Sequence, residues 1–255
     1  MRHFYVLFFM CLAFNAVAQL QPVASGVYHW NESDVKKDGL REGRKIVQGT
    51  TPEFEYFDIH ATTQLKGAPA KPAHAQKDIE ELIIIKEGTM RFTVDNKTAV
   101  LGKGSVMLIP PLASQQIENI GNGPLTYYVL QFRSKKMNME RSTLAGGTLL
   151  LNYDSLKYTE KDNKGTRKFF ERPTAMCDNF EMHITYLKQK GPSHAPHTHV
   201  DTEIILVIEG DAEMTIDGKN YSGTTGDLFI AESGKLHVVG NASDKPCSYY
   251  AFKWR

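Results

Sequence analysis

Hydrophobic residues occur in short runs along the chain, and turn residues separate these runs. "MRFTV" precedes Asp95-Asn96, and "AEMTI" precedes Asp217-Gly218, an arrangement typical of strands that lead into hairpin turns. No stretch carries a helical period over three turns. The pattern therefore predicts an all-β fold.

Two of the predicted strands, 82–85 and 204–208, are apolar at every position. Successive side chains of a strand point to opposite faces, so both faces of these strands must be covered. We expect a sandwich whose outer side packs on another domain or on a second chain. A homodimer is left open by this pattern.

The two aliphatic strands belong to an internal repeat with an offset of about 122 to 123 residues. "EELIIIKEGTMRFTVDNK" (80–97) corresponds to "TEIILVIEGDAEMTIDGK" (202–219), and "TYYVLQFR" corresponds to the C-terminal "SYYAFKWR". The repeat predicts two all-β domains in tandem, with the boundary in the polar segment 134–163.

Residues 1–18 have the pattern of a cleaved signal peptide. Arg2 precedes an apolar stretch from Phe4 to Phe14, and Ala16-Val17-Ala18 is a small-x-small cleavage site. The apolar stretch is shorter than the roughly 20 residues of a membrane-spanning helix. The pattern predicts a secreted or periplasmic protein that begins at Gln19 and has no membrane association after cleavage.

Charge and composition narrow the classes of partner. Loss of Arg2 reduces the formal charge from +1 to zero, which provides no electrostatic attraction to nucleic acid or anionic lipid. An apolar content of 41% is sufficient for real hydrophobic cores. We therefore expect a small-molecule partner and no nucleic acid.

Two cysteines, Cys177 and Cys247, remain after cleavage. In an oxidising compartment they could form a disulfide, and as separate residues they would be buried thiols. The sequence leaves both alternatives open.

Candidate metal ligands gather in the second repeat. His197 and His199 are two residues apart, so a strand would project both from one face, and Glu203 has the same parity. His237 could supply a fourth ligand from another strand. Three imidazoles and one carboxylate suit one divalent transition metal, with Mn, Fe, Ni, Cu and Zn as the candidates.

The spacing of these residues resembles the two motifs of the cupin superfamily. The first motif reads Gly191-x5-His197-x-His199-x3-Glu203-x6-Gly210. The second reads Gly226-x5-Glu232-x-Gly234-x2-His237-x3-Asn241, with Glu232 where the family usually has proline. The resemblance implies two tandem cupin jelly-roll barrels, over residues 24–134 and 147–255, with the metal held in the second by His197, His199, Glu203 and His237.

The first repeat lacks two of the imidazoles. It has His74 and Glu81, but Gln76 and Gln115 occupy the other ligand positions, and one extra residue precedes Glu81. Glutamine binds divalent metals less strongly than imidazole. We expect one metal centre and a degenerate first site, with a weakened second metal site as the alternative.

Cupins carry out many reactions, so the resemblance does not fix the activity. We expect a metal-dependent enzyme acting on a small oxygen-rich substrate, by isomerase or lyase chemistry on a sugar acid or by dioxygenase chemistry. The alternative is a non-catalytic protein that binds a small ligand or a metal. Tyr186 is the candidate proton donor inside the barrel, or else a core tyrosine. His194 would line the mouth of the pocket or lie in solvent.

Overall fold

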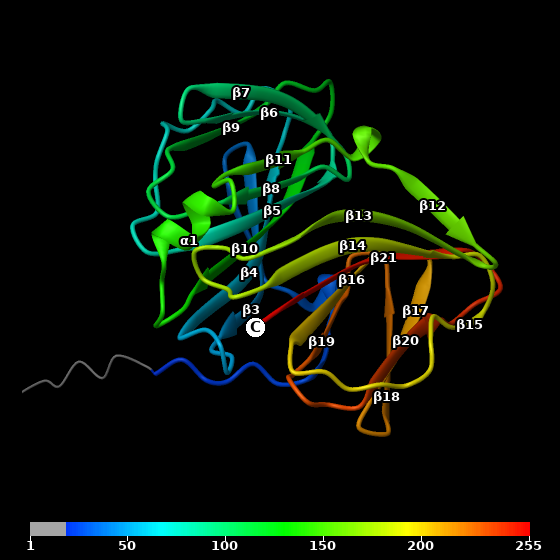
Figure 1. Cartoon of the computed structure of the whole chain (residues 1–255). Coiled ribbons are helices and arrows are strands. Elements are labelled where there is room, and N and C mark those ends of the chain that lie inside the picture. Colours follow the sequence, from blue (N-terminus) through cyan, green and yellow to red (C-terminus); the bar gives the residue numbers. More distant parts are fainter. Residues whose placement is uncertain (1–18) are drawn as a thin grey trace, which may run out of the picture.

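The computed structural model describes residues 19–255 (Figure 1), and the predicted signal segment 1–18 lies outside the described residues. These residues form four β-sheets, one short helix and two single-turn 3-10 helices. The all-β prediction is confirmed. In this part of the chain no helix combines the length and the apolar character needed to cross a membrane.

A large sheet and a small sheet make up the first jelly roll, called the first barrel below. The large sheet has the order β11-β8-β5-β10-β4-β3-β2, and the small sheet has the order β7-β6-β9. Their strands are β2 (Val35–Asp38), β3 (Arg41–Gly49), β4 (Tyr56–Gln64), β5 (Glu80–Glu87), β6 (Thr89–Val94), β7 (Lys97–Gly102), β8 (Val106–Ile109), β9 (Gln115–Asn119), β10 (Leu125–Arg133) and β11 (Leu149–Leu151).

The second barrel repeats this plan. Its large sheet has the order β1-β19-β16-β21-β14-β13-β12, and its small sheet has the order β15-β20-β17-β18. Their strands are β1 (Gly26–Tyr28), β12 (Tyr158–Lys161), β13 (Lys164–Arg172), β14 (Phe180–Leu187), β15 (Gly191–Pro192), β16 (Thr202–Glu209), β17 (Asp211–Ile216), β18 (Lys219–Thr224), β19 (Leu228–Ala231), β20 (His237–Asn241) and β21 (Cys247–Trp254).

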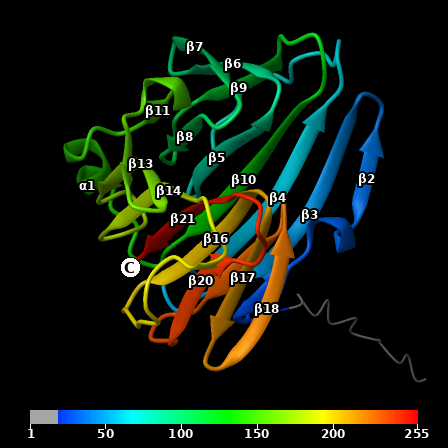
Figure 2. The same ribbon diagram turned by 90° about the vertical axis from the view of Figure 1, so that its right-hand side faces the viewer.

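The two large sheets pack face to face (Figure 2), and this contact covers the outer sides of the aliphatic strands. In β5, Leu82 and Ile84 belong to an apolar cluster that both large sheets share. Ile83 and Ile85 point the other way, into the core of the first barrel. The other domain therefore supplies the cover that the strand pattern requires.

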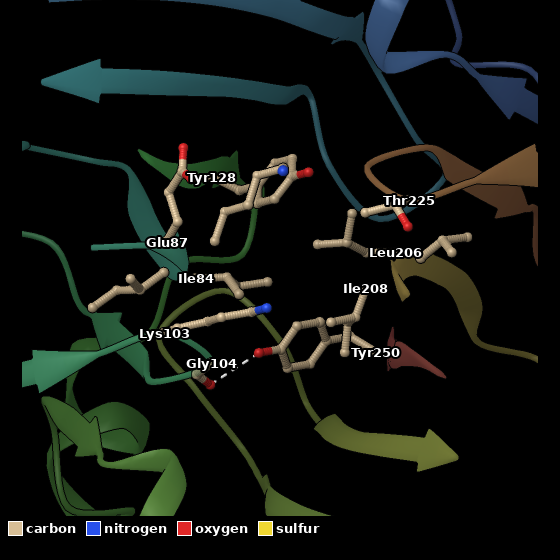
Figure 3. Close-up of a pocket in the computed structure, with 12 residues that line it drawn as sticks. Ile84, Glu87, Lys103, Gly104, Tyr128, Leu206, Ile208, Thr225 and Tyr250 are labelled. Carbon is tan, nitrogen blue, oxygen red and sulfur yellow. Dashed lines mark hydrogen bonds between the residues drawn. The ribbon is translucent and has the colours of Figure 1, made fainter. Parts of the chain in front are cut away.

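A small cavity remains between the two sheets. It has a volume of about 140 Å³ and is lined by Ile84, Tyr128, Leu206 and Tyr250, among others (Figure 3). The Tyr250 hydroxyl donates a hydrogen bond to Gly104 O at 2.9 Å, and the Tyr128 hydroxyl donates to Gly226 O at 3.4 Å. The two tyrosines occupy equivalent positions, so the cavity lies where the two repeats meet.

Each repeat contributes its first strand to the sheet of the other repeat. β1 pairs with β19, with Gly26 opposite Ile230, and β11 pairs with β8, with Leu149 opposite Leu108. Figure 1 shows β11 beside β8 in the first barrel. The repeat ranges 24–134 and 147–255 stay a prediction, but each sheet is completed by a strand from the other repeat.

The 3-10 helices η1 (Trp30–Glu32) and η2 (Tyr153–Ser155) hold these exchanged strands in place. Trp30 N donates to Asp227 Oδ1 at 2.8 Å, and Tyr153 N donates to the Ser105 hydroxyl at 3.2 Å. Both aromatic rings lie against a glycine of positive φ, Gly226 or Gly104, where a Cβ atom would be 3.2 or 2.8 Å from the aromatic side chain. Glycine is therefore required at both contacts.

Glu232, the departure from the cupin pattern, anchors one exchanged strand. Its Oε2 accepts a hydrogen bond from the Ser25 hydroxyl at 2.8 Å, and its backbone N–H donates to the same hydroxyl at 3.0 Å. Ser25 immediately precedes β1. A proline at position 232 could not donate the second bond.

The remaining helix, α1 (Met139–Leu144), lies in the connection between the repeats. The Asn138 side chain caps it by accepting a hydrogen bond from Arg141 N at 2.8 Å. The Arg141 side chain donates to Thr174 O at 2.6 Å. This connection is therefore fixed to the loop before β14.

Cys177 and Cys247 are separate buried thiols. Cys177 lies just before β14 and belongs to the cluster between the sheets, whereas Cys247 belongs to the core of the second barrel. Cys247 begins β21 opposite Leu187, at the far end of β14 from Cys177. The separation exceeds the Cα distance of about 7 Å that a disulfide allows.

We expect both thiols to be alkylated when the mature protein is denatured without reductant. The measurement is the intact mass after treatment with iodoacetamide, and the fully reduced protein is the control. A non-reduced sample that gains no label would contradict the separate-thiol arrangement.

Glu80 is a buried carboxyl at the contact between the repeats. Its Oε2 accepts hydrogen bonds from the Thr174 hydroxyl at 2.7 Å and from Met176 N at 3.0 Å. Burial raises the pKa of Glu80 to about 7, although these hydrogen bonds oppose the shift. The folded state therefore holds a proton that the unfolded chain releases near pH 4.5.

The free energy of unfolding should accordingly fall as the pH rises from 4.5 to 7. We expect Glu80→Gln to stabilise the protein by about 3 kcal/mol at pH 8 and to have little effect near pH 4.5, because each pKa unit corresponds to about 1.4 kcal/mol. Urea unfolding at both pH values measures this difference. Glu140→Gln, at an exposed position of α1, is the control, and an equal gain for Glu80→Gln at both pH values would refute the assignment.

Candidate metal centre

Backbone pairing brings the three predicted histidines of the second barrel together. His197 forms an isolated antiparallel bridge with His237, in which His197 N donates to His237 O at 3.1 Å and His237 N donates to His197 O at 3.0 Å. Gly234 N donates to His199 O at 2.8 Å. Residues 197–199 therefore follow the start of β20 as an extended segment with one bridge, and they do not form a regular strand.

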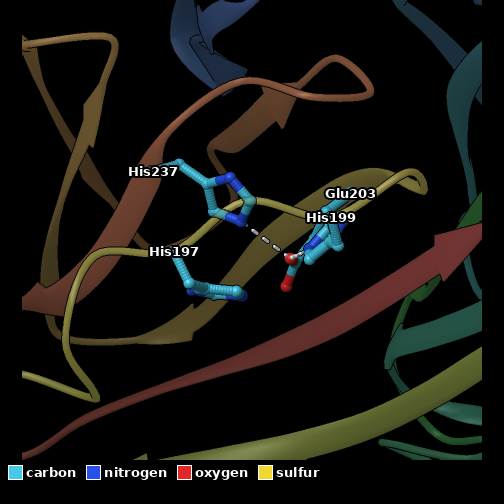
Figure 4. Close-up of side chains that lie close together, drawn as sticks. All are labelled: His197, His199, Glu203 and His237. Carbon is cyan, nitrogen blue, oxygen red and sulfur yellow. Dashed lines mark hydrogen bonds and ion pairs between the residues drawn. The ribbon is translucent and has the colours of Figure 1, made fainter.

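The predicted ligand side chains converge at one point (Figure 4). Each of the four residues His197, His199, Glu203 and His237 offers a ligand atom, and these atoms all lie within 4.8 Å of one another. Glu203 Oε2 is 2.8 Å from His199 Nε2 and 3.1 Å from His237 Nε2. This spacing is compact enough for one ion to contact all four side chains.

Hydrogen bonds at the other ring nitrogens fix the orientation of two imidazoles. His199 Nδ1 lies 2.9 Å from Asp201 O, and His237 Nδ1 lies 2.8 Å from Lys235 O. A carbonyl oxygen only accepts, so Nδ1 carries the proton and the neutral ring turns its Nε2 lone pair toward Glu203. Two lone pairs facing a carboxylate require either extra protons or a cation between them. Metal-bound histidines are usually oriented by such bonds to carbonyls, so the residues fit a divalent metal.

The electrostatics of the cluster favour the ligand forms of Glu203 and His197. Burial alone would raise the pKa of Glu203, but when His199 and His237 carry the extra protons, their Nε2–H groups donate to the carboxylate, outweigh burial and hold the pKa well below its usual range. Burial, together with the nearby His194 and His237, lowers the pKa of His197. At neutral pH the cluster therefore contains a carboxylate and at least one neutral imidazole.

A cavity of about 470 Å³ opens beside the cluster, and several charged and polar side chains contribute to its lining. The lining includes Lys164, His183, Thr185, His194, His197, Tyr249 and Lys253. The ring of His194 lies 4.5 Å from that of His197, so the structure places His194 at this cavity. The cavity could admit a small molecule to the side of the cluster that the protein leaves open.

A charged network extends across the floor of this cavity. Glu181 lies 3.3 Å from His183 and 3.5 Å from Lys253. The hydrogen bond from His183 is the main reason why the pKa of Glu181 falls to about 2, although burial opposes it. Burial lowers the pKa of Lys164, although the Glu203 carboxylate opposes the shift.

The structure does not bring Tyr186 to the histidines. Tyr186 packs against the cluster between the large sheets, and its hydroxyl lies 2.6 Å from the hydroxyl of Tyr153. On β14 the cavity is lined instead by His183 and Thr185, which have the opposite parity. Tyr186 lies on the same face of β14 as Met182 and Ile184, and this face packs at the contact between the large sheets. Tyr186 is therefore a core tyrosine, as the alternative prediction stated, and it does not reach the histidines.

Sequence reasoning missed Lys164, His183 and Lys253. The strand register brings two of them to one place, because Glu181 and His183 of β14 lie opposite Lys253 and Ala251 of β21. Assigning the other face of β14 to the barrel interior would have identified His183, and Lys253 lies on the neighbouring strand opposite Glu181 of that face.

In the first barrel, hydrogen bonds between side chains occupy the corresponding place. Gln115 Nε2 donates to Glu81 Oε2, and Gln131 Nε2 donates to Glu81 Oε1 at 2.7 Å. His74 bridges to Gln115 through the backbone. Among residues 19–255, the group of histidine and acidic side chains close enough to hold a metal ion is the one in the second barrel. A single metal centre per chain remains the prediction.

Comparisons with known proteins agree with the two-barrel architecture. Two segments, residues 62–131 and 184–253, match the family model of the cupin domain. An uncharacterized protein of Methanocaldococcus jannaschii is 42% identical over 52 residues, which are 20% of this chain and 42% of that protein. The chain therefore matches less than half of the length of this relative.

Several solved structures share the fold at low sequence identity. AerE from Microcystis aeruginosa has a TM-score of 0.70 at 11% identity, covering 91% of this chain and all of AerE (100%). Ylba from E. coli has a TM-score of 0.69 at 15% identity, covering 94% of this chain and 95% of Ylba. Oxalate decarboxylase from Bacillus subtilis, which has Mn(II) centers, has a TM-score of 0.65 at 13% identity, covering 90% of this chain and 77% of the enzyme.

We expect His237→Ala to abolish tight metal binding, because it removes one of three imidazoles. Gln115→Ala, at the equivalent position of the first barrel, should leave the metal content nearly unchanged and reduce stability by about 1 to 3 kcal/mol through loss of a buried hydrogen bond. Elemental analysis of protein purified without a metal-affinity resin should give close to one metal per wild-type chain. Two metals per chain, or metal loss in Gln115→Ala, would overturn this prediction.

Proposed function

Because the chain belongs to the cupin family, with two cupin domains in tandem, we propose that its second barrel is the active site of a metal-dependent enzyme whose substrate is a small carboxylate. The observation that carries the proposal is the placement of Lys164, Lys253 and His183 around a cavity beside the His3-Glu cluster. A sealed metal in an apolar barrel would instead suit a non-catalytic binding protein. A lining that can bind charge and transfer protons favours an enzyme.

A divalent metal held by His197, His199, Glu203 and His237 would supply Lewis-acid chemistry, by polarising a carbonyl or carboxylate oxygen of the substrate. The chain itself supplies the binding energy and the orientation. The ammonium groups of Lys164 and Lys253 line the same cavity and favour an anionic substrate. Their charge would hold a carboxylate beside the cluster.

His183 is the candidate group for proton transfer. Glu181 lies 3.3 Å from its Nδ1 and orients the ring, which lines the cavity. Such a carboxylate–imidazole pair can exchange a proton with a substrate hydroxyl or α-carbon. A hydroxy- or keto-carboxylate combines the carboxylate that the lysines favour with an oxygen that a metal would polarise.

The similarity in fold to an oxalate decarboxylase with Mn(II) centers makes Mn and small dicarboxylates worth including in the assays. Fold alone does not transfer an activity, so isomerase, lyase, decarboxylase and dioxygenase reactions are all compared. The export expected from residues 1–18 places this activity outside the cytoplasm in our proposal.

We expect turnover of at least one hydroxy-, keto- or dicarboxylate by the metal-loaded protein. The assay uses protein reconstituted separately with Mn, Fe or Zn, with and without oxygen, against a panel that includes oxalate, gluconate and small keto acids. Failure with every metal and every carboxylate would favour the alternative of a binding protein.

For the substrate that is turned over, Lys164→Ala should raise KM by about tenfold or more through loss of a charge-assisted contact, with unchanged metal content. Lys157→Ala, at an exposed position between η2 and β12, is the control for a change of one positive charge. An unchanged KM in Lys164→Ala would exclude this lysine from substrate binding.

A further inference from the structure

The first barrel has counterparts of some of the charged and polar residues that line the cavity beside the histidine cluster of the second barrel. Arg41 begins β3 as Lys164 begins β13, and in the registers Arg41 lies opposite Gln64 where Lys164 lies opposite Leu187. Both cations line the cavity of their own barrel. A positive charge is therefore present at the same place in both repeats.

The carboxylate–imidazole pair is also present twice. His60 Nδ1 lies 2.6 Å from Asp58 on β4, as His183 lies 3.3 Å from Glu181 on β14. Each histidine lines the cavity of its barrel. On the neighbouring strands β10 and β21, Tyr127 and Tyr249 line the two cavities at equivalent positions. The two cavities therefore share a cation, a carboxylate–imidazole pair and a tyrosine, whereas the first has Gln131 where the second has Lys253 and lacks the imidazoles for a metal.

The cavity of the first barrel has a volume of about 220 Å³. At about 30 Å³ of liquid per water molecule, this is room for roughly seven waters or for one small metabolite. It is smaller than the pockets of roughly 300 Å³ or more that hold drug-sized ligands. The ligand that fits must be small.

Two of the residues that line this cavity, Gln64 and Gln115, each have a buried amide oxygen, Oε1, without a hydrogen-bond partner within the protein. Gln64 is 3% exposed and Gln115 is 2% exposed. Their Nε2 atoms are already engaged, with the Tyr127 hydroxyl and with Glu81. A buried acceptor without a partner costs about 1 to 3 kcal/mol, so these oxygens favour a ligand that brings hydroxyl donors.

The charged groups that line the cavity favour an anion. Arg41 and Lys71 contribute two positive charges, whereas Glu81 contributes one negative charge that is already satisfied by Gln115 and Gln131. We propose that the first barrel binds a small polyhydroxy carboxylate without a metal. The carboxylate pairs with Arg41, and hydroxyl groups donate to Gln64 and Gln115. This site goes beyond the proposed function, since it requires neither the metal nor turnover in the second barrel.

Calorimetric titration of gluconate into the full mature chain, treated with EDTA, tests this proposal. We expect saturable binding in the absence of metal, tighter than for sorbitol, which lacks the carboxylate, and for acetate, which lacks the hydroxyls. Arg41→Ala should weaken gluconate binding by about tenfold or more, the loss expected for a charge-assisted contact. Lys157→Ala, at an exposed position that lines neither cavity, should leave this binding within about twofold.

Gln64→Leu tests the amide oxygen separately. Leucine occupies the equivalent position 187 in the second barrel, so the substitution suits the strand, and thermal unfolding checks that the variant is folded. We expect at least a threefold loss of gluconate affinity with sorbitol binding weakened as well. Absence of saturable gluconate binding to the EDTA-treated wild type would overturn the proposal, as would binding that Lys164→Ala abolishes and Arg41→Ala does not affect. The first outcome leaves metal-dependent turnover in the second barrel untouched, and the second outcome would place gluconate in the second barrel instead.

Discussion

The structure depends on the burial of two strands, β5 and β16, on both of their faces. Alternate side chains of each strand enter a barrel core, and the others form the contact between the two large sheets. That contact includes aromatic residues: the centroid of the Phe54 ring lies 5.0 Å from that of Phe132 and 5.3 Å from that of Trp254. Because neither strand has a face that tolerates water, the two repeats must fold against each other, and the barrels are held in a fixed relation.

The same alternation places the chemistry. Glu203 shares its face of β16 with Ile205 and Val207, which lie in the core of the second barrel, so its carboxylate points inward to the histidines. In the first barrel, Glu81 has the equivalent position and instead accepts hydrogen bonds from two glutamines. One backbone plan therefore supports a metal-type cluster in one barrel and an amide network in the other, while one cation and one carboxylate–imidazole pair are kept in both.

The repeat and the all-β fold can be predicted from patterns along the chain, and the grouping of His197, His199 and Glu203 from their local spacing, whereas His237 was assigned through the resemblance to the second cupin motif. Two residues of separation put His197 and His199 close together whether or not the segment is a regular strand. The orientation of β14 could not be predicted in this way, since its apolar face could enter the barrel core or pack on the other large sheet. The tertiary packing places that apolar face on the other sheet and turns the polar face toward the cavity. For that reason Tyr186 was assigned to the barrel interior and His183 was missed. The exchanged strands β1 and β11 have three residues each, too few for a periodic pattern to reveal their partners.

The exchange of these strands has a consequence for the order in which the chain can fold. During synthesis the first barrel cannot complete its large sheet until Leu149–Leu151 emerge, after every other strand of that barrel is available. Gly26–Tyr28 emerge early but have no partner until Leu228–Ala231 are made, near the end of the chain. Domains of many proteins fold one after the other as they are synthesised. Here an early segment must wait through most of translation, and a chaperone that shields its exposed edge would have its greatest effect during that interval.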